Sequence, residues 1–259
     1  MRKSMVLPAI ARLEYRPLLR SALAAILAPT LAAVMAAMWA ARSLALSTGF
    51  PTRLLALLGS GALLILYGLP AHGPHHRFGP ANHMTVARGA LVAFLAALLL
   101  ETVDTRVQYV ALGAAILAAV MDAVDGWLAR RTHMVSVFGA RFDMETDAVF
   151  ILVLCLWAWH LDKAGAWVVT GGLLRYAFVL AGALVPRLRG PLPDSFRRKT
   201  IAALQMVALL IVICPFVPVL VSALVAALAL AALTISFLLD TRWLLLRPEP
   251  EPPEPMFER

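Results

Sequence analysis

The sequence predicts an all-α protein that crosses a membrane several times. Hydrophobic residues make up 61% of the 259 positions, and charged residues make up only 15%, against about 25% in a typical soluble domain. The mean hydropathy is +0.83, and apolar runs of about 20 residues recur along the chain. Because so few polar side chains could not cover a soluble globule, we expect lipid to be the solvent. The same composition excludes a disordered chain, a collagen-like chain and a small disulfide scaffold.

About eight apolar segments are long enough to be membrane helices. The first follows a basic start, but it is longer than the 7–15 apolar residues of a signal peptide and further segments follow it, so we expect it to be retained. Pro215 and Pro218 mark a tight turn between the last two segments. The eight segments lie at residues 20–41, 54–70, 84–100, 107–123, 144–161, 165–185, 200–217 and 219–240.

The basic residues predict the orientation of these helices. If the segments alternate from a cytoplasmic N-terminus, 18 of the 23 Lys and Arg residues fall on the cytoplasmic side and four on the other. Positive charge collects in cytoplasmic loops, so we expect both termini and the loop at 122–142 in the cytoplasm, in a bacterial inner membrane. This orientation also accounts for the net charge of +8, and we expect no nucleic-acid partner.

Two further features belong to the chain's organisation. The segment 243–259 is rich in Pro and Glu, a composition that cannot build a core, so we expect it to be disordered. Cys155 and Cys214 lie inside apolar runs and are expected to be thiols that face the core or the lipid.

Acidic residues concentrate where two of the predicted helices end and begin. Asp122 and Asp125 are three positions apart, so they share one helix face. Asp143 and Asp147 follow Gly139 at intervals of four, which makes one stripe on the next helix. The short loop between the two segments predicts an antiparallel pair whose carboxylates converge.

A converging group of four carboxylates predicts a metal site. Each ionised Asp at membrane depth costs about 2.5–3.5 kcal/mol, and four of them repel one another unless cations lie between them. Oxygen ligands favour Mg²⁺, Mn²⁺ or Ca²⁺ over zinc, and we expect Mg²⁺ or Mn²⁺. The alternative is a set of solvated Asp residues at helix ends, which the alignment with glycines disfavours. Gly126, Ala129 and Gly139 leave room for a bulky group such as a nucleotide, and Arg130 offers a cation for a phosphate.

The pattern of these residues resembles a known signature. Residues 122–147 read D-x-x-D-G-x-x-A-R, eight residues, then G-x-x-x-D-x-x-x-D, which resembles the CDP-alcohol phosphotransferase family at every fixed position. The resemblance implies transfer of a phosphatidyl or phosphoalcohol group from a CDP-linked donor to an alcohol, with release of CMP. It also implies that Asp122, Asp125 and Asp143 bind two divalent ions, that Asp147 lies beside them as general base, and that the nucleotide is bordered by Gly126, Ala129, Arg130 and Gly139.

Two other stretches are similar to elements of the same family. Residues 81–89 look like its N-x-x-T-x-x-R element and give Asn82, Thr85 and Arg88, of which Asn82 and Thr85 are expected near the nucleotide. Ala81 between Pro80 and Asn82 is a minor departure, and an ordinary helix start capped by Asn82 is the alternative. Residues 197–206 are similar to the K-T-x-x-x-x-Q element, carried here by Lys199, Thr200 and Gln205.

The resemblance also implies an organisation. It covers a six-helix catalytic domain at 80–242, preceded by an N-terminal segment with two extra helices at 1–79, and it implies a homodimer. Members of the family use different acceptors, among them glycerol 3-phosphate, inositol phosphate, serine and diacylglycerol.

Three basic residues bear on the acceptor. Arg175 lies inside a predicted span, and Arg198 and Lys199 lie on the side of the carboxylates. We expect them to bind a phosphate on the acceptor, which favours glycerol 3-phosphate, CDP-diacylglycerol as donor and a phosphatidylglycerophosphate-synthase-like enzyme. The alternatives are a structural ion pair for Arg175 and ordinary cytoplasmic charge for the loop.

Other classes of function are less well supported. A divalent-metal transporter would spread acidic residues over several spans, whereas here they concentrate in one helix pair. A non-catalytic relative would not need the complete set of four Asp residues. His72, His75, His76 and His83 fit no tetrahedral zinc spacing, and the Gly and Pro residues among them predict a loop.

Overall fold

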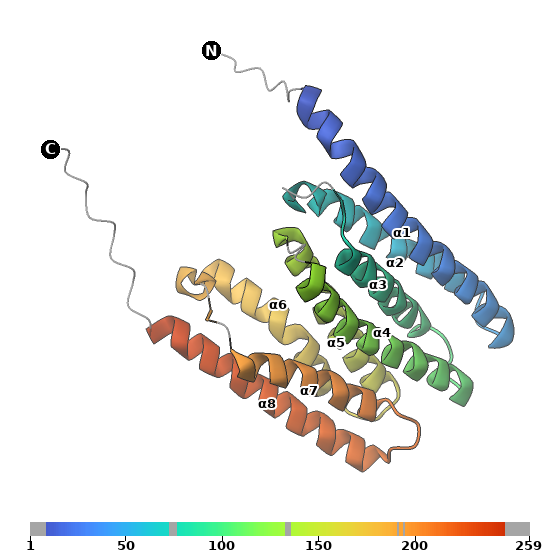
Figure 1. Ribbon diagram of the computed structural model, residues 1–259. Coiled ribbons are helices and arrows are strands. Elements are labelled where there is room, and N and C mark those ends of the chain that lie inside the picture. The colour runs from blue at the N-terminus through green and yellow to red at the C-terminus, as the bar shows by residue number, and fades with distance from the viewer. Residues whose placement is uncertain (1–8, 73–76, 133–135, 191, 194, 247–259) are drawn as a thin grey trace.

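Eight α-helices make up most of the described chain, as the computed structural model shows (Figure 1). The structure describes residues 9–72, 77–132, 136–190, 192–193 and 195–246, with the backbone alone at 9–15, 125–132 and 189. Three short 3₁₀ turns, η1 (Leu69–His72), η2 (Ala166–Val168) and η3 (Pro186–Arg189), connect helices, and this part of the chain contains no strand. The helices are α1 (Ala9–Ser43), α2 (Phe50–Gly68), α3 (Pro80–Leu98), α4 (Thr105–Thr132), α5 (Val137–His160), α6 (Val169–Leu184), α7 (Phe196–Val212) and α8 (Val219–Leu246).

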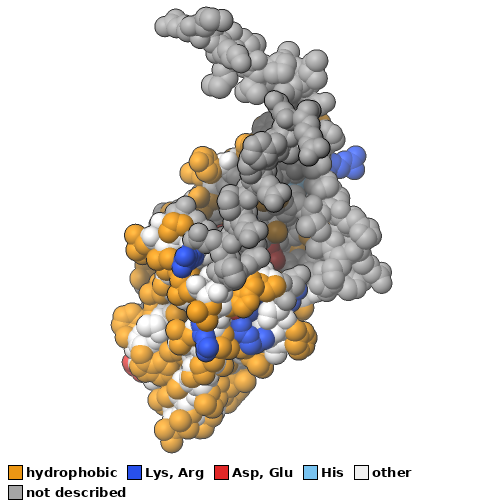
Figure 2. All heavy atoms as spheres, turned by 90° about the vertical axis from the view of Figure 1, so that its left-hand side faces the viewer, with side chains coloured by type: hydrophobic (Ala, Val, Ile, Leu, Met, Phe, Trp, Pro, Cys, Tyr) orange, Lys and Arg blue, Asp and Glu red, His pale blue; other side chains and the backbone are white. Residues whose placement is uncertain are grey.

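Six of the described helices are long and apolar enough to cross a membrane, which confirms the prediction of an all-α, polytopic membrane protein. They are α1, α2, α3, α4, α6 with η2, and α8. The other two are α5, which carries three acidic residues near its start, and α7, which has 17 residues. On the face shown in Figure 2, hydrophobic side chains cover most of the lower part, as expected for a surface in contact with lipid.

Successive helices run in alternating directions across the bundle (Figure 1). Helices α1 and α2 pack against α3, which also packs against α4 and α5, and the chain then continues through α6 and α7 to α8. Trp157 of α5 is fully buried, and its indole N–H donates to the Leu95 carbonyl of α3 at 3.1 Å. A Cβ on Gly172 would lie 2.6 Å from Leu152 Cα, so glycine permits the close contact of α6 with α5. These contacts fix α3 and α5 beside each other.

A buried carboxylate joins the loops at one end of the bundle. Glu101, in the α3–α4 loop, accepts hydrogen bonds from the backbone N–H and the hydroxyl of Ser47, both at 2.8 Å. Its carboxylate also forms an ion pair with Arg53 at the start of α2. The Glu101 side chain is only 3% exposed, so these donors satisfy a charge that would be costly to bury alone. Glu101 thereby fastens the α1–α2 pair to the rest of the bundle.

Replacement of Glu101 by Ala is expected to destabilise the folded protein by about 1–3 kcal/mol, because it leaves the Ser47 and Arg53 donors without their acceptor. The measurement is the thermal midpoint in detergent, followed with a thiol dye in a Cys214→Ser background, where the signal reports exposure of buried Cys155. Glu101→Gln keeps one acceptor oxygen and should lower the thermal midpoint by less than Glu101→Ala does. Equal midpoints for the wild type and Glu101→Ala would contradict this role.

The helices extend beyond several of the predicted apolar segments. The segment 107–123 matches the candidate span Thr105–Val124, and α4 continues beyond it to Thr132. Helix α5 begins at Val137, before the apolar segment 144–161. Both helices carry polar residues past the apolar run, where backbone hydrogen bonds continue the helix. Cys155 and Cys214 are both free thiols, as expected. The predicted disordered tail at 243–259 starts too early, because residues 243–246 complete the last turn of α8, and its remainder from 247 onward lies outside the described residues.

Candidate active site

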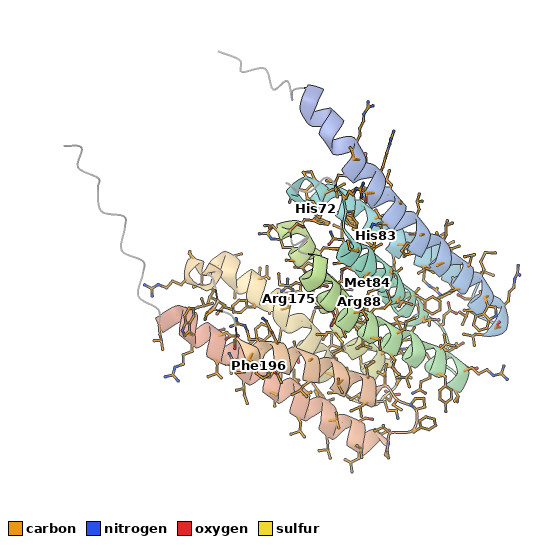
Figure 3. The ribbon with its side chains drawn as sticks, viewed as in Figure 1. His72, His83, Met84, Arg88, Arg175 and Phe196 are labelled. Atoms are coloured by element: carbon orange, nitrogen blue, oxygen red, sulfur yellow. The ribbon has the colours of Figure 1, made fainter. Side chains whose placement is uncertain are left out.

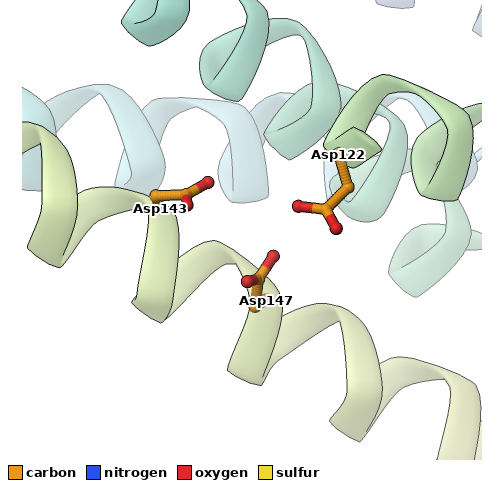
Figure 4. Close-up of side chains that lie close together, drawn as sticks. All are labelled: Asp122, Asp143 and Asp147. Carbon is orange, nitrogen blue, oxygen red and sulfur yellow. The ribbon is translucent and has the colours of Figure 1, made fainter. Parts of the chain in front are cut away.

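Three carboxylates from two helices converge at the end of the bundle opposite Glu101. Asp122 lies on α4, and Asp143 and Asp147 lie one turn apart on α5. One oxygen from each carboxylate lies within 4.8 Å of the other two, and Figure 4 shows the three groups pointing into a common space. The prediction that these positions come together is therefore confirmed for three of the four Asp residues. The side chain of Asp125 lies outside the described residues.

A buried arginine from a third helix joins the three carboxylates. Arg88 of α3 forms ion pairs with Asp122, with Asp143 at 2.5 Å and with Asp147 at 3.0 Å. Its side chain is 0% exposed, whereas those of the three Asp residues are 32–41% exposed. Figure 3 shows Arg88 part-way along α3. We define Asp122, Asp143, Asp147 and Arg88 as the Asp–Arg cluster.

The expected direct pairing of α4 with α5 needs a correction. Both helices pack against α3, and Arg88 of α3 supplies the charge that holds their carboxylates together. In the sequence, Arg88 belongs to the stretch 81–89 that looks like an element of a known family. Nothing in that stretch indicates that Arg88 lies beside the carboxylates. A clue is available all the same, because an arginine inside an otherwise apolar helix needs a buried acid or carbonyl as partner.

The Asp–Arg cluster fits a divalent metal ion. Three carboxylates and one guanidinium leave a formal charge of −2 at the edge of an apolar bundle, which one divalent cation would neutralise. Asp147 Oδ1 is buried and accepts no hydrogen bond among the described residues, and its 3.0 Å ion pair with Arg88 leaves this oxygen able to bind a cation as well. The donors are all carboxylate oxygens, the ligands that Mg²⁺ and Mn²⁺ take. The ions would be held by Asp122, Asp143 and Asp147.

The start of α3 lies directly against the start of α5. The helix α3 begins after Gly79, whose φ of 82° is in the left-handed region that favours glycine. Asn82, in the first turn, donates its side-chain N–H to the Phe78 carbonyl and is not the N-cap. A Cβ on Gly139 of α5 would lie 2.7 Å from Asn82 Oδ1. Glycine at 139 is therefore needed for this contact, and two of the residues expected near the nucleotide are neighbours.

A buried histidine supports the same region. The Ser136 hydroxyl caps α5 by accepting from the Gly139 N–H at 2.9 Å, and it also hydrogen-bonds to His72 Nδ1 at 2.8 Å. His72 is fully buried in η1, and its Nε2 hydrogen-bonds to the Arg77 carbonyl at 2.9 Å. His72 is thus a structural residue, while no described histidine joins the Asp–Arg cluster. His75 and His76 lie outside the described residues.

Comparison with known proteins decides the family. The family model for CDP-alcohol phosphatidyltransferase matches residues 78–238, well over half of the chain. The chain belongs to the CDP-alcohol phosphatidyltransferase family. Comparisons with curated proteins and with solved structures gave no match. The chain is therefore a transferase of substituted phosphate groups in a family that acts on membrane lipids.

Membership of the CDP-alcohol phosphatidyltransferase family gives a function to the observed geometry. The family uses a CDP-linked lipid donor and an alcohol acceptor, and it generally requires a divalent metal. The matched region begins just before α3 and ends within α8, so the Asp–Arg cluster lies inside it and α1 and α2 lie outside it. This phosphatidyltransferase is an integral membrane protein, as its six long apolar helices indicate.

Two of the three basic residues expected to bind the acceptor have carboxylate partners in this phosphatidyltransferase. Arg175 of α6 pairs with Glu145 of α5 at 2.5 Å. Arg198 of α7 lies 3.4 Å from Asp240 of α8 and donates to the Pro193 carbonyl, and its neighbour Arg197 pairs with Asp240 at 2.5 Å. None of these residues belongs to the Asp–Arg cluster. Lys199 lies on the first turn of α7.

The remaining predicted nucleotide residues fall into two groups. Thr85 is buried on α3, one turn before Arg88, and its hydroxyl donates to the Ala81 carbonyl at 3.1 Å. The side chains of Gly126, Ala129 and Arg130 lie outside the described residues, although α4 continues through these positions to Thr132. The helical spacing places Ala129 one turn beyond Asp125 along α4.

Replacement of Ser136 by Ala is expected to destabilise the protein by about 1 kcal/mol, the usual cost of a lost N-cap. It should also lower phosphatidyltransferase activity, because the cap fixes the turn that holds Gly139 against Asn82. Thermal unfolding and an assay of CMP release measure the two effects. Ser136→Thr retains a capping hydroxyl and should restore both, and a Thr variant as impaired as the Ala variant would contradict the capping role.

Proposed function

We propose that this phosphatidyltransferase transfers a phosphatidyl group from CDP-diacylglycerol to glycerol 3-phosphate and releases CMP. The observation that carries this proposal is the convergence of Asp122, Asp143 and Asp147 around buried Arg88, within the part of the chain that matches the family. A group of oxygen ligands at the edge of a membrane suits a pyrophosphate that is attached to a lipid.

The reaction exchanges one phosphorus–oxygen bond for another. The acceptor hydroxyl oxygen bonds to the phosphorus next to diacylglycerol, and the bond from that phosphorus to the bridging oxygen of CMP breaks. Asp147, whose Oδ1 accepts no hydrogen bond among the described residues, takes the proton of the acceptor hydroxyl as general base. Arg88 holds Asp143 and Asp147 in place through its two ion pairs.

The proposed metal site holds two divalent ions, Mg²⁺ or Mn²⁺. Asp122, Asp125, Asp143 and Asp147 are the proposed ligands. When bound, the ions neutralise the pyrophosphate and the charge that develops on departing CMP. On the protein side, Asn82, Thr85, Gly126, Ala129, Arg130 and Gly139 are the proposed nucleotide-binding residues.

The acceptor proposal depends on the basic residues around α6 and α7. Arg197 and Arg198 together exceed the single charge of Asp240, so this group keeps a positive charge that a phosphate could use. Arg175, Arg198 and Lys199 are the proposed contacts of the phosphate of glycerol 3-phosphate. The alternatives are inositol phosphate or serine as acceptor, or transfer of an aminoalcohol phosphate to diacylglycerol.

The proposal includes an orientation and an assembly. We place both termini and the Asp–Arg cluster on the cytoplasmic side of a bacterial inner membrane, following the 18 Lys and Arg residues predicted on that side. We propose a catalytic domain at 80–242, an N-terminal segment at 1–79 and a homodimer.

The experiment is an assay of CMP release by the purified full chain in detergent with Mg²⁺ or Mn²⁺. CDP-diacylglycerol is the donor, and glycerol 3-phosphate, inositol phosphate, inositol and serine are added one at a time. We expect glycerol 3-phosphate to stimulate CMP release the most. When glycerol 3-phosphate is labelled, the label should appear in a lipid product. Stimulation by another acceptor alone, or only by diacylglycerol with a CDP-aminoalcohol, would overturn the proposed substrate pair.

A further inference from the structure

An apolar groove lies on α3, between α2 and α5. Its volume is about 520 Å³, within the range of ligand sites in proteins, about 300–1,000 Å³. Helices α2 and α5 both pack against α3, and Figure 1 shows α2 beside α3. We define the α2–α5 groove by its floor on α3 (Val86, Gly89, Ala93, Ala96) and by walls that include Gly61 of α2 and Phe142 of α5.

Small residues keep the α2–α5 groove open. A Cβ built on Gly61 or on Gly89 meets no other atom within 4 Å, and the rest of the floor is mostly alanine. A groove lined mainly by apolar side chains and bare backbone offers van der Waals contact but few hydrogen bonds. Its natural occupant is therefore a hydrocarbon chain.

The groove is separate from the Asp–Arg cluster. On α5, Phe142, Glu145 and Val149 line the groove at helical spacing, whereas Asp143 and Asp147 lie on a different face. Between the two faces, α3 and α5 are joined by the ion pairs of Arg88 with Asp143 and Asp147.

Aromatic side chains pack at the end of the groove near the start of α5. There Phe138 packs with Phe78 and His72, with ring centroids 6.0 Å and 5.8 Å away. A lipid chain attached to a nucleotide at the cluster would have to pass between α3 and α5, where the ion pairs of Arg88 join the two helices. The geometry thus favours a second lipid in the groove, not the reacting one.

The length of the groove fits one leaflet of a bilayer. Its floor runs along α3 from Val86 to Ala96, which at about 1.5 Å per residue is about 15 Å. Half of the hydrocarbon core of a bilayer, which is about 30 Å thick, has the same length. The Val86 end is the end nearer the Asp–Arg cluster, so the groove spans the leaflet on that side.

A cation stands on the groove wall near the same end. Arg141 of α5 lines the groove, is exposed, and forms no ion pair with any residue that the structure describes. The nearby Glu145 is already paired with Arg175. A guanidinium at the boundary of the apolar region is suited to a lipid phosphate, which it binds with two parallel hydrogen bonds.

We propose that the α2–α5 groove binds one bilayer phospholipid, with an acyl chain along α3 and its phosphate on Arg141. This lipid is distinct from the reacting donor. It fills the space between α2 and α5. The N-terminal helices, which lie outside the family match, would then form one wall of a lipid site.

The test is native mass spectrometry of the full chain with dioleoyl phosphatidylglycerol as probe. Gly89→Leu projects a side chain into the groove. Its matched control is Gly113→Leu on α4, where a Cβ also meets no atom within 4 Å but the site is not in the groove. The wild type and Gly113→Leu should retain one tightly bound lipid.

Gly89→Leu should weaken retention of that lipid by about tenfold, because displacing about two methylene groups from an apolar site has that effect. Arg141→Gln, a change at an exposed position, should weaken it about threefold without altering the fold. Both variants should keep the wild-type KM for CDP-diacylglycerol. Equal retention in all four proteins would overturn the proposal.

A second result would also overturn the proposal. If Gly89→Leu raises the KM for CDP-diacylglycerol, and CDP-diacylglycerol displaces the bound lipid, the groove holds the reacting lipid. Because lipid retention is measured without turnover, failure of this proposal is distinguishable from failure of the proposed reaction.

Discussion

Replacement of Asp147 by Asn is expected to lower the rate of CMP release by about 10²–10⁴-fold, the usual contribution of a general base. Asparagine has nearly the same shape, so the packing of α5 against α3 should remain. It cannot take a proton from the acceptor, and it removes one negative charge from the Asp–Arg cluster. The measurement is the initial rate with saturating donor and acceptor.

The matched control for this variant is Asp104→Asn. Asp104 lies in the α3–α4 loop near Glu101, and its Oδ1 accepts from the Val107 N–H at 2.8 Å. Asparagine caps helices as well as aspartate does, so this variant should keep its activity. An Asp147→Asn protein with more than about a tenth of the wild-type rate would be incompatible with a general-base role.

Replacement of Arg88 by Gln is expected to abolish measurable activity and to make folding depend on metal. Without the guanidinium, three carboxylates within 4.8 Å of one another have no buried counter-charge, and removal of one partner from such a group costs about 3–5 kcal/mol. Divalent ions should recover part of this loss, because they bind a cluster of charge −3 more tightly than one of charge −2.

Thermal midpoints with EDTA and with Mn²⁺ measure this effect. The Arg88→Gln protein should have a lower midpoint than the wild type in EDTA, and Mn²⁺ should raise its midpoint by more than it raises that of the wild type. Equal midpoints in EDTA, together with equal responses to Mn²⁺, would show that Arg88 does not neutralise the carboxylates.

The carboxylates of the site were predictable because their spacing has one geometric meaning. Asp143 and Asp147, four residues apart, share a face in any α-helix, and Asp122 lies at the end of the preceding apolar run. Arg88 was different, because its distance to the carboxylates depends on how α3 packs against α4 and α5. That packing is decided by many side-chain contacts, such as Gly139 against Asn82, which no local pattern reveals.

Helix number was predicted better than helix length for a related reason. Apolar runs report which residues face lipid or core, whereas a helix continues as long as its backbone hydrogen bonds do. The start of α5 at Val137 depends on capping by Ser136, a signal available in the sequence but weaker than hydropathy. Hydropathy alone omits the first seven residues of α5, which include Gly139 and Asp143. Their intervals of four with Asp147 are the signal that places them on this helix.

The interpretation of Arg175 shows the limit of single-residue reasoning. An arginine inside a span indicates either a ligand site or a structural pair, and only the fold shows which acidic group lies beside it. The structure supplies Glu145 as that partner. The sequence could not, because Glu145 lies 30 positions earlier on another helix. The α2–α5 groove was equally unpredictable from the sequence, because small residues on α3 do not indicate which other helices lie beside them.

The most direct test of the central claim is Mn²⁺ binding to the purified protein, measured from the loss of the free-ion signal in electron paramagnetic resonance. The wild type and Asp104→Asn should bind Mn²⁺ with the same stoichiometry, and Asp143→Asn should bind fewer ions or bind them at least about tenfold more weakly. Identical titrations of Asp143→Asn and the wild type would contradict the claim that the Asp–Arg cluster is the metal site of this transferase.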